Sequence, residues 1–493
     1  MNNIRKFTIL PAAILLMVFA GFKVASPGKT DVLMQLIMQS LIANHYSSQD
    51  VNDEFSTQVY DLYVKRLDYN KRFFTQQDVD KLKKYRLKID DDVRNGQQEF
   101  FSEAYDLITR RTKDAQKYYQ DILAKPFDFN INESIEQDPD KLEYAGSEAD
   151  LRERWRKNLK YSVMTRLYDK MKQQENDEED KEIKSFAELE KDAREKVLKM
   201  HDDWFKRMMR MDENDHMATF INAIANVYDP HTAYYPPKDK ANFDIGMTGR
   251  LEGIGATLQE KEGYIHIVRI VPGSPSWKQG ELEADDIILK VGQGSEEPVD
   301  VVDMPLDEAV QMIRGKKGTE VRLTVKKVSG VIKVIPIIRD VVVLEETYAK
   351  SAILEAPGSD EKIGYIQLPK FYADFTRSGG PNCSSDVKKE IAKLKDEGVS
   401  GIVFDLRNNG GGSLYDVVKM SGLFIENGPI VQVKSKGSPA EVLSDRDSKV
   451  HWDGPLVVMV NNFSASASDF NMPSSTAALC KISRRPSATS LPS

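Results

Sequence analysis

GIVFDLRNNGGGSL, residues 401–414, is an apolar run that ends in three glycines, and it predicts a buried strand leading into a glycine turn. A second segment, LVVMVNNFSASASD at residues 456–469, predicts another buried strand, followed by a loop of serines and small residues. Glycines allow backbone N–H groups to be aimed at an anion, and small residues let a peptide carbonyl approach a serine hydroxyl. Loops at strand ends are held by a rigid sheet, so the two segments together predict an acyl-transfer site.

The hydrophobic pattern divides the chain into regions of different character and predicts a multidomain α+β protein. Phe55, Val59 and Leu62 recur at helical spacing in a helix-rich first region, whereas the second region has short β-type runs separated by glycine and proline. The third region alternates strands and helices. The expected bounds are a signal peptide or anchor at 1–26, a helical N-terminal domain at 30–235, a β domain at 243–335, an incomplete α/β core at 340–470 and an aberrant tail at 471–493.

Individual elements are expected within the second and third regions. The second region predicts strands at 265–268, 286–289 and 321–325 and a helix at 307–313. The third predicts strands at 364–368, 401–406 and 456–460 and helices at 385–395 and 417–424.

Four segments occur in the order, and at about the spacing, of a known family. They are YDPHTAY at 228–234, LEGIGATL at 251–258, and the two segments quoted above. Over roughly residues 40–470 the chain resembles the tail-specific, or C-terminal processing, serine proteases, which use a Ser/Lys dyad. The resemblance implies a helical domain that partly encloses the substrate, a PDZ domain and an α/β protease core of peptidase family S41. It also implies endoproteolysis of unfolded or C-terminally tagged proteins, with no metal or organic cofactor and with an adaptor protein as a further partner.

The resemblance also implies roles for individual residues of the protease core. By motif match Ser466 is the nucleophile, and Gly411 and Gly412 contribute to the oxyanion site. Arg407 is expected to support the glycine loop. Asp469, which stands where the family usually carries the longer glutamate, is also expected in a supporting role.

The PDZ-like region carries a second expected site. Gly253, Ile254, Gly255 and Ala256 match a carboxylate-binding loop, whose N–H groups hold a peptide C-terminus while the peptide adds as a strand. Glycine is needed there because the ligand approaches the backbone closely.

The general base of the dyad is not found in this sequence. The family lysine lies roughly two dozen residues after the serine, which falls at 490–492 here, and Lys481 is the only lysine that follows Ser466. Codons permitted for residues 473–479, read from the third base, give Lys-Gln-Tyr-Gly-Arg-Ala, similar to a family stretch. We therefore hypothesise a frameshift and expect the polypeptide to be an impaired endopeptidase. A catalytically inactive, PDZ-containing peptide-binding protein is the main alternative, and an unrelated structural α/β protein is a third.

The tetrapeptide DPHT at 229–232 resembles an acid/base pair, but its proline keeps the chain extended or turned. It predicts a structural junction in which Asp229 or Thr232 caps a helix and His231 bonds backbone groups. A catalytic His231 remains the alternative.

Composition and charge argue against several other classes of function and indicate where the protein is located. The net charge is -8 with no basic stripe, which argues against nucleic-acid binding. Two cysteines, Cys383 and Cys480, and scattered histidines predict neither a disulfide framework nor a metal site. Arg5 and Lys6 precede an apolar run at 7–22, as in a secretory signal peptide. The chain is expected in the bacterial periplasm, with tethering to the inner membrane if the segment stays uncleaved.

Overall fold

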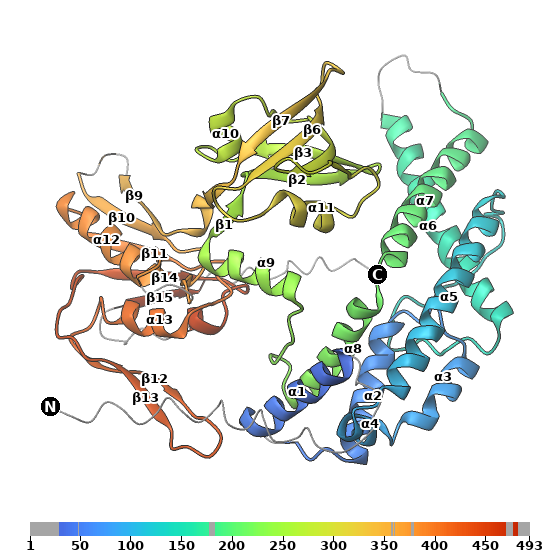
Figure 1. The fold of residues 1–493 in the computed structure, drawn as a ribbon, viewed down its shortest axis with the longest axis horizontal. Helices are drawn as coiled ribbons and strands as arrows, with labels where there is room; N and C mark the ends of the chain where they lie inside the picture. The colour runs from blue at the N-terminus through green and yellow to red at the C-terminus, as the bar shows by residue number, and fades with distance from the viewer. Residues whose placement is uncertain are drawn as a thin grey trace. The chain divides into compact units, whose positions relative to one another are not determined.

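The computed structural model describes residues 29–47, 49–176, 183–355, 358, 360–375, 379–469 and 477–481, and the chain divides into two compact units between Tyr234 and Tyr235 (Figure 1). The segment expected as a signal peptide, 1–26, and the charged run at 177–182 lie outside the described residues. Within them, no helix has both the length and the apolar character needed to cross a bilayer.

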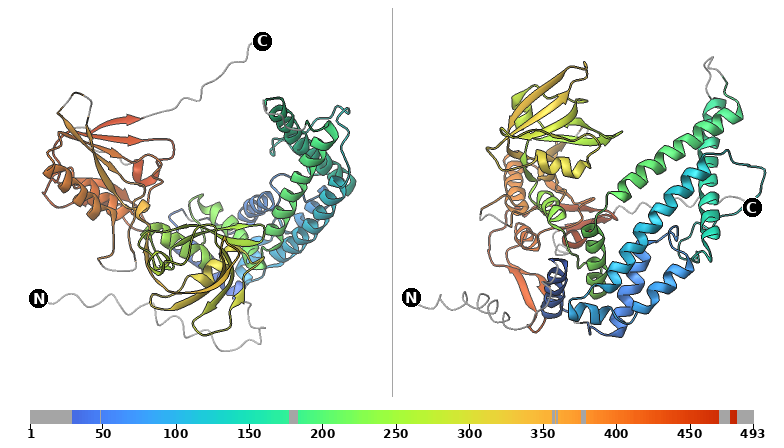
Figure 2. Two further views of the ribbon diagram at one scale, coloured as in Figure 1. Left: turned by 90° about the horizontal axis from the view of Figure 1, so that it is seen from above. Right: turned by 45° about the vertical axis from the view of Figure 1, so that its right-hand side comes forward.

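The first unit is helical, as its sequence periodicity predicts. Its helices are α1 (Lys29–Asn44), α2 (Asp53–Leu67), α3 (Gln76–Leu82), η1 (Lys83–Tyr85), α4 (Ile89–Asn95), α5 (Glu99–Leu123), α6 (Glu148–Asn176), α7 (Phe186–Met209) and α8 (Glu213–Tyr228). Helices α5, α6 and α7 pack against one another, as the blue-green and green helices of Figure 2 show. Capping boxes start several of these helices: Thr75 with Asp78 at α3 is one.

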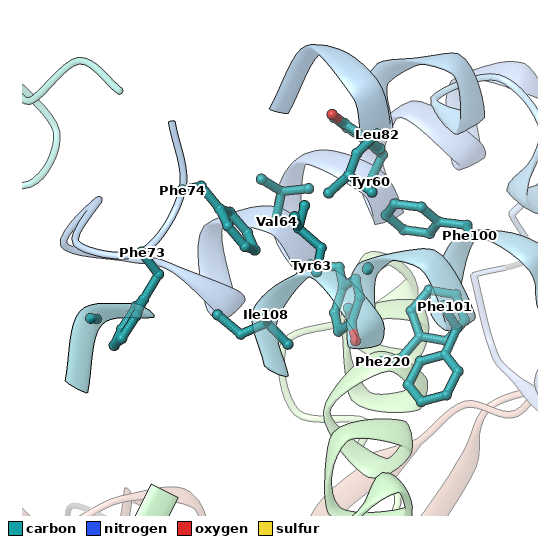
Figure 3. Close-up of a cluster of buried hydrophobic side chains, with 14 of the residues drawn as sticks. Tyr60, Tyr63, Val64, Phe73, Phe74, Leu82, Phe100, Phe101, Ile108 and Phe220 are labelled. Carbon is teal, nitrogen blue, oxygen red and sulfur yellow. The ribbon is translucent and has the colours of Figure 1, made fainter. Parts of the chain in front are cut away.

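An aromatic cluster forms the centre of this unit (Figure 3). The Tyr63 ring is fully buried and lies 4.9 Å from the Phe220 ring and 5.7 Å from the Phe100 ring, measured between centroids. Among the described residues, the Tyr63 hydroxyl has no hydrogen-bond partner. Burial also raises the pKa of this phenol, so it stays a neutral but unsatisfied donor.

Replacing Tyr63 with phenylalanine should therefore stabilise the helical unit. Removing a buried donor that lacks an acceptor is expected to raise the free energy of unfolding by about 1 kcal/mol. Urea denaturation followed by circular dichroism at 222 nm measures the change. The matched control is Tyr60→Phe, which loses the hydrogen bond from the Tyr60 hydroxyl to the Val79 carbonyl and should lower stability by a similar amount. If Tyr63→Phe and Tyr60→Phe lowered stability equally, the Tyr63 hydroxyl would not be an unsatisfied buried donor.

The second unit begins with α9 (Pro237–Thr248) and a five-stranded antiparallel path that matches the expected β domain. Its strands run in the order β2-β3-β4-β6-β7, with β5 paired to β4, and β1 pairs separately with β8. The bounds are β1 (Arg250–Gly253), β2 (Ala256–Lys261), β3 (Tyr264–Ile270), α10 (Pro275–Gln279), β4 (Ile287–Gln293), β5 (Val299–Asp300), α11 (Leu306–Ile313), β6 (Glu320–Lys326), β7 (Ile332–Ile338) and β8 (Asp340–Val343). Strand β2 lies at an edge of this sheet, and α11 packs beside it.

The remainder of the unit is an α/β layer around the sheet β15-β14-β11-β10-β9. Its elements are η2 (Glu345–Thr347), β9 (Lys350–Glu355), β10 (Lys362–Gln367), α12 (Cys383–Asp396), β11 (Gly401–Asp405), α13 (Leu414–Ser421), β12 (Gly428–Val433), β13 (Glu441–Asp445), β14 (Leu456–Val460), η3 (Ser466–Asp469) and β15 (Ala477–Lys481). Strands β10, β11, β14 and β15 are parallel, and β9 is antiparallel. The buried side chains of β11 and β14 pack with α12 and α13 into one core.

These observations confirm the multidomain α+β class and each strand predicted for the third region. Helix α13 begins at Leu414, three residues before the predicted start, because Ser413 accepts the Asp416 N–H and caps it. An aberrant tail was expected at 471–493, but in the structure Ala477–Lys481 pairs with β14 and so extends the sheet. Five residues without alternation are too short for periodicity to detect.

Candidate active site

The two quoted segments meet at one edge of the sheet. Strands β11 and β14 are parallel neighbours, with Asp405 opposite Met459, so the loops that follow them leave from the same end. The Leu406 N–H donates to the Met459 carbonyl at 2.9 Å and extends this pairing to the start of the glycine loop. The serine loop and the glycine loop are therefore adjacent, as the sequence predicts.

The three serines of the second loop have different environments. The Ser464 hydroxyl donates to the Leu406 carbonyl at 2.8 Å, and the buried Ser468 hydroxyl donates to the Asn409 carbonyl at 2.8 Å. Both hydroxyls therefore serve to hold the loop. Ser466 between them is exposed and opens η3.

The Ser466 backbone is held in an unusual conformation. Its φ is +55°, in the left-handed region that non-glycine residues seldom adopt. Such a conformation costs about 1–3 kcal/mol and persists where the surrounding structure imposes it, which is often at functional sites. A serine at a sharp turn after a strand presents its hydroxyl outward from the sheet, the arrangement that nucleophilic serines use in other folds.

The glycine loop lies directly against Ser466. A Cβ atom at Gly411 would stand 2.9 Å from the Ser466 Cβ, and Gly411 has φ +104°. At Gly412, where φ is +145°, a Cβ would stand 2.2 Å from the Phe371 carbonyl oxygen. Both positions thus require glycine for conformation and for space.

The N–H groups of these two glycines are not equivalent. The buried Gly411 N–H donates to the Asn409 side-chain oxygen at 2.9 Å, so it is not free to bind an oxyanion. Gly412 is exposed, and among the described residues no hydrogen bond uses its N–H. In this structure Gly411 therefore packs closely against the serine loop with its N–H bonded to Asn409, and Gly412 is the one of the two glycines whose N–H has no partner among the described residues.

Arg407 folds back onto the end of β11. Its Nε and Nη2 donate to the buried Asp405 carboxylate at 2.9 and 2.7 Å, and the Tyr365 hydroxyl donates to the same carboxylate at 2.5 Å. Burial alone would raise the pKa of Asp405, but the bonds from Arg407 and Tyr365 hold it below its ordinary value. Arg407 thus supports the loop through Asp405. The side chains of Asp469 and Lys481, and residues 490–492, lie outside the described part of the chain.

Two asparagines, Asn461 and Asn409, join the loops, and no sequence pattern predicted their roles. Asn461 accepts the Asn408 N–H and donates to the Asn408 side-chain oxygen, both at 2.9 Å. Asn409 is fully buried, and its amide connects Leu368 with Gly411. Because asparagine is common in glycine-rich turns, an Asn-Asn-Gly run signals only a turn.

The expected carboxylate-binding loop joins β1 to the edge strand β2. Gly253 ends β1, opposite Asp340, and Ala256 begins β2. Gly255 has φ +76°, and a Cβ there would lie 2.2 Å from the Ser274 Cβ. The Ile254 and Gly255 carbonyls accept bonds from Ser276 and Val271, whereas no hydrogen bond between described residues uses the N–H groups of Ile254 and Gly255.

The junction after α8 is organised by Asp229. Its N–H donates to Ala225 and ends the helix, and its carboxylate accepts the His231 N–H at 2.9 Å and the Thr232 hydroxyl at 3.0 Å. The capping role predicted for Asp229 is present. The His231 side chain differs from expectation, since it is 91% exposed and contacts the Asp229 carboxylate.

Comparison with known proteins follows the same division of the chain. Residues 37–238 match the tail-specific protease N-terminal domain, residues 244–326 the PDZ domain and residues 362–472 peptidase family S41. The chain belongs to the tail-specific protease family. The tail-specific protease of Haemophilus influenzae is 34% identical over 432 residues, which cover 87% of this chain and 58% of that protein.

Two further relatives cover parts of the chain. The carboxy-terminal processing protease CtpA of Bacillus subtilis is 34% identical over 249 residues. The matched region covers 50% of this chain and 48% of CtpA. The crystallised PDZ domain of a Vibrio cholerae carboxy-terminal protease, solved with a peptide, is 41% identical, covers 19% of this chain and 97% of that domain, and has a TM-score of 0.18. This family member spans about half of the length of the curated relatives that it matches.

The described residues contain no group of three or more His, Cys, Asp or Glu residues placed to hold a metal ion. Cys383 is buried and unpaired, and burial raises the pKa of its thiol.

Proposed function

We propose that this chain is built as a serine endopeptidase that cleaves proteins recognised by their C-termini, with Ser466 as the nucleophile. The observation that carries the proposal is the contrast among the three serines: Ser464 and Ser468 bond backbone carbonyls, while Ser466 is exposed, has φ +55° and lies against Gly411. Family membership supports the same reaction class.

The proposed reaction is acyl transfer through an acyl-enzyme on Ser466. The Ser466 Oγ attacks the scissile carbonyl carbon as a base removes the hydroxyl proton, and the carbonyl oxygen becomes an oxyanion that the Gly412 N–H binds. Collapse of this tetrahedral species breaks the peptide C–N bond, and the leaving amine takes the proton. Water then hydrolyses the acyl-enzyme. Gly411 contributes by admitting the serine loop at van der Waals distance.

Substrate recognition is assigned to the PDZ domain. Strand β2 is an edge strand beside α11, so an extended peptide can add to it while Ile254 and Gly255 hold the terminal carboxylate. The substrates proposed are unfolded or C-terminally tagged proteins with an apolar last residue, and an adaptor that delivers them is a further proposed partner.

Amidating the C-terminus of such a peptide should weaken its binding by about ten- to a hundredfold, because charge-assisted hydrogen bonds to the carboxylate are lost. Isothermal titration calorimetry of the 493-residue chain with the free-acid and amidated forms of one peptide measures the ratio of the two dissociation constants. A peptide with a charged last residue serves as the control for apolar selectivity. Equal affinity of the acid and the amide would remove the carboxylate-loop assignment.

We further propose that the 493-residue polypeptide cleaves poorly. Serine needs a base, the family uses a lysine in a Phe-Gly-Lys-Gly-like turn, and Lys481 is the only lysine after Ser466 in this sequence. The second candidate function, favoured by this same observation, is peptide binding without catalysis. Turnover of an unstructured peptide discriminates between the two.

Export is proposed on the sequence of the N-terminal segment alone. Arg5 and Lys6 before the apolar run at 7–22 support passage to the periplasm, with membrane tethering if the segment is retained. Cell fractionation with and without the first 26 residues tests this, and unchanged cytoplasmic recovery of both forms would contradict it.

A further inference from the structure

We propose that Asn409 is the positioning residue of this site: it fixes the serine loop to the glycine loop and leaves the Gly412 N–H as the group that faces the reacting atoms. This inference rests on the proposed role of Ser466. Asn409 lies in neither the nucleophile segment nor the pair of glycines that the motif match identified.

The side chain of Asn409 uses both ends of its amide. Its Nδ2 donates to the Leu368 carbonyl at the end of β10 at 2.9 Å, and its Oδ1 accepts the Gly411 N–H at 2.9 Å. Because one partner is an acceptor and the other a donor, the amide fits in one orientation only. The residue has no exposed surface, so the loss of either bond would leave a buried polar group unsatisfied.

The main chain of the same residue holds the serine loop. The Asn409 carbonyl accepts the Ala465 N–H at 3.1 Å and the Ser468 hydroxyl at 2.8 Å, which are the residues on either side of the Ser466 turn. One buried residue therefore contacts β10, the glycine loop and both sides of the nucleophile loop. Because Asn409 is hydrogen-bonded to both loops, Gly411 is held close to Ser466.

The bond to Gly411 also selects the oxyanion donor. With its N–H directed at the Asn409 side chain, Gly411 cannot donate to a substrate, and the neighbouring exposed Gly412 N–H remains. Asn409 acts on the reaction through these two glycines and through Ser466, without touching the substrate itself.

An Asn409→Asp substitution provides a sharp test because it replaces the donor with a titratable group. When protonated, the new carboxyl can donate to Leu368 and accept from Gly411, as asparagine does; when ionised, it faces a carbonyl oxygen in a buried site. Burial raises the folded-state pKa of this carboxyl above its unfolded value of about 3.9. The loop should thus be held at low pH and released as pH rises through the folded-state pKa.

Hydrogen–deuterium exchange of the full 493-residue chain, read on peptides covering 405–415 and 461–469, measures this release without requiring catalysis. For Asn409→Asp we expect exchange about tenfold or more faster than wild type near pH 8 and close to wild type near pH 5, because the pH change restores the protonated form. Asn409→Ala should exchange faster at both pH values. Asn408→Asp, the matched control, places the same carboxyl at an exposed neighbour; it keeps both bonds to Asn461, because an aspartate oxygen still accepts from the Asn461 amide, and it should follow wild type throughout.

Two results would overturn the inference. One is that Asn409→Asp exchanges at the wild-type rate near pH 8, and the other is that it exceeds the wild-type rate by the same factor at both pH values. Ser466→Ala should leave exchange unchanged. If hydrolysis experiments remove Ser466 as the nucleophile, the exchange result still decides whether Asn409 joins the loops, so the two failures are distinguishable.

Discussion

The 493-residue polypeptide is expected to hydrolyse an unfolded reporter with an apolar C-terminus at least about a thousandfold more slowly than a chain that carries the family lysine, because removing one member of a nucleophile–base unit costs several orders of magnitude. The lysine-bearing chain has a family-like segment with a Phe-Gly-Lys-Gly turn in place of the residues after Phe470. A serine hydroxyl is a weak nucleophile near neutral pH, and a neutral, desolvated lysine amine can take its proton. Initial rates at equal enzyme concentration measure the difference.

Two substitutions control this comparison. Ser466→Ala in the lysine-bearing chain should return the rate to that of the 493-residue polypeptide or below. Lys481→Ala in the 493-residue polypeptide should change nothing. Full activity in the unaltered polypeptide that Lys481→Ala abolishes would show that Lys481 is the base and would contradict the proposed impairment.

Gly412→Ala should destabilise the protease core by about 2–5 kcal/mol, because it combines a strained backbone conformation with overpacking. The added Cβ would meet the Phe371 carbonyl oxygen at 2.2 Å at a φ of +145°, and a backbone atom cannot move aside as a flexible side chain can. Urea denaturation of the 493-residue chain, followed by tryptophan fluorescence, measures the loss. This readout is independent of catalysis.

Gly410 offers the matched control for this substitution. A Cβ at Gly410 would meet nothing within 4 Å, and its φ lies outside the left-handed range. Gly410→Ala should therefore stay within about 0.5 kcal/mol of wild type. Equal loss of stability at both positions would show that the loop as a whole, and not the contact with Phe371, sets the effect.

Sequence patterns predicted those elements whose burial leaves a simple signal. Strands β11 and β14 are nearly continuous apolar runs, because helices and loops cover the sheet, and their bounds match the prediction within one residue. Strand β9 was not predicted, since most of its residues are exposed at the antiparallel edge. The β12–β13 hairpin was missed for the same reason: its side chains are largely exposed or half-buried.

Those residues of the candidate site that lie within a recognisable sequence motif were predictable. Ser466 and the two glycines follow from sequence, whereas the choice between Gly411 and Gly412 depends on where a single N–H points. Asn409 could not be recognised as a connector because its partners Leu368 and Ser468 are 41 and 59 residues away in the chain. Such contacts depend on the parallel pairing of β10, β11 and β14, which local patterns do not encode.

The central claim, that Ser466 is the nucleophile, is tested most directly by reacting the lysine-bearing chain with a fluorophosphonate and locating the adduct by tandem mass spectrometry. The prediction is a single phosphonylated residue, Ser466, with no adduct in the Ser466→Ala form. An adduct on Ser464 or Ser468, or undiminished labelling after Ser466→Ala, would contradict it.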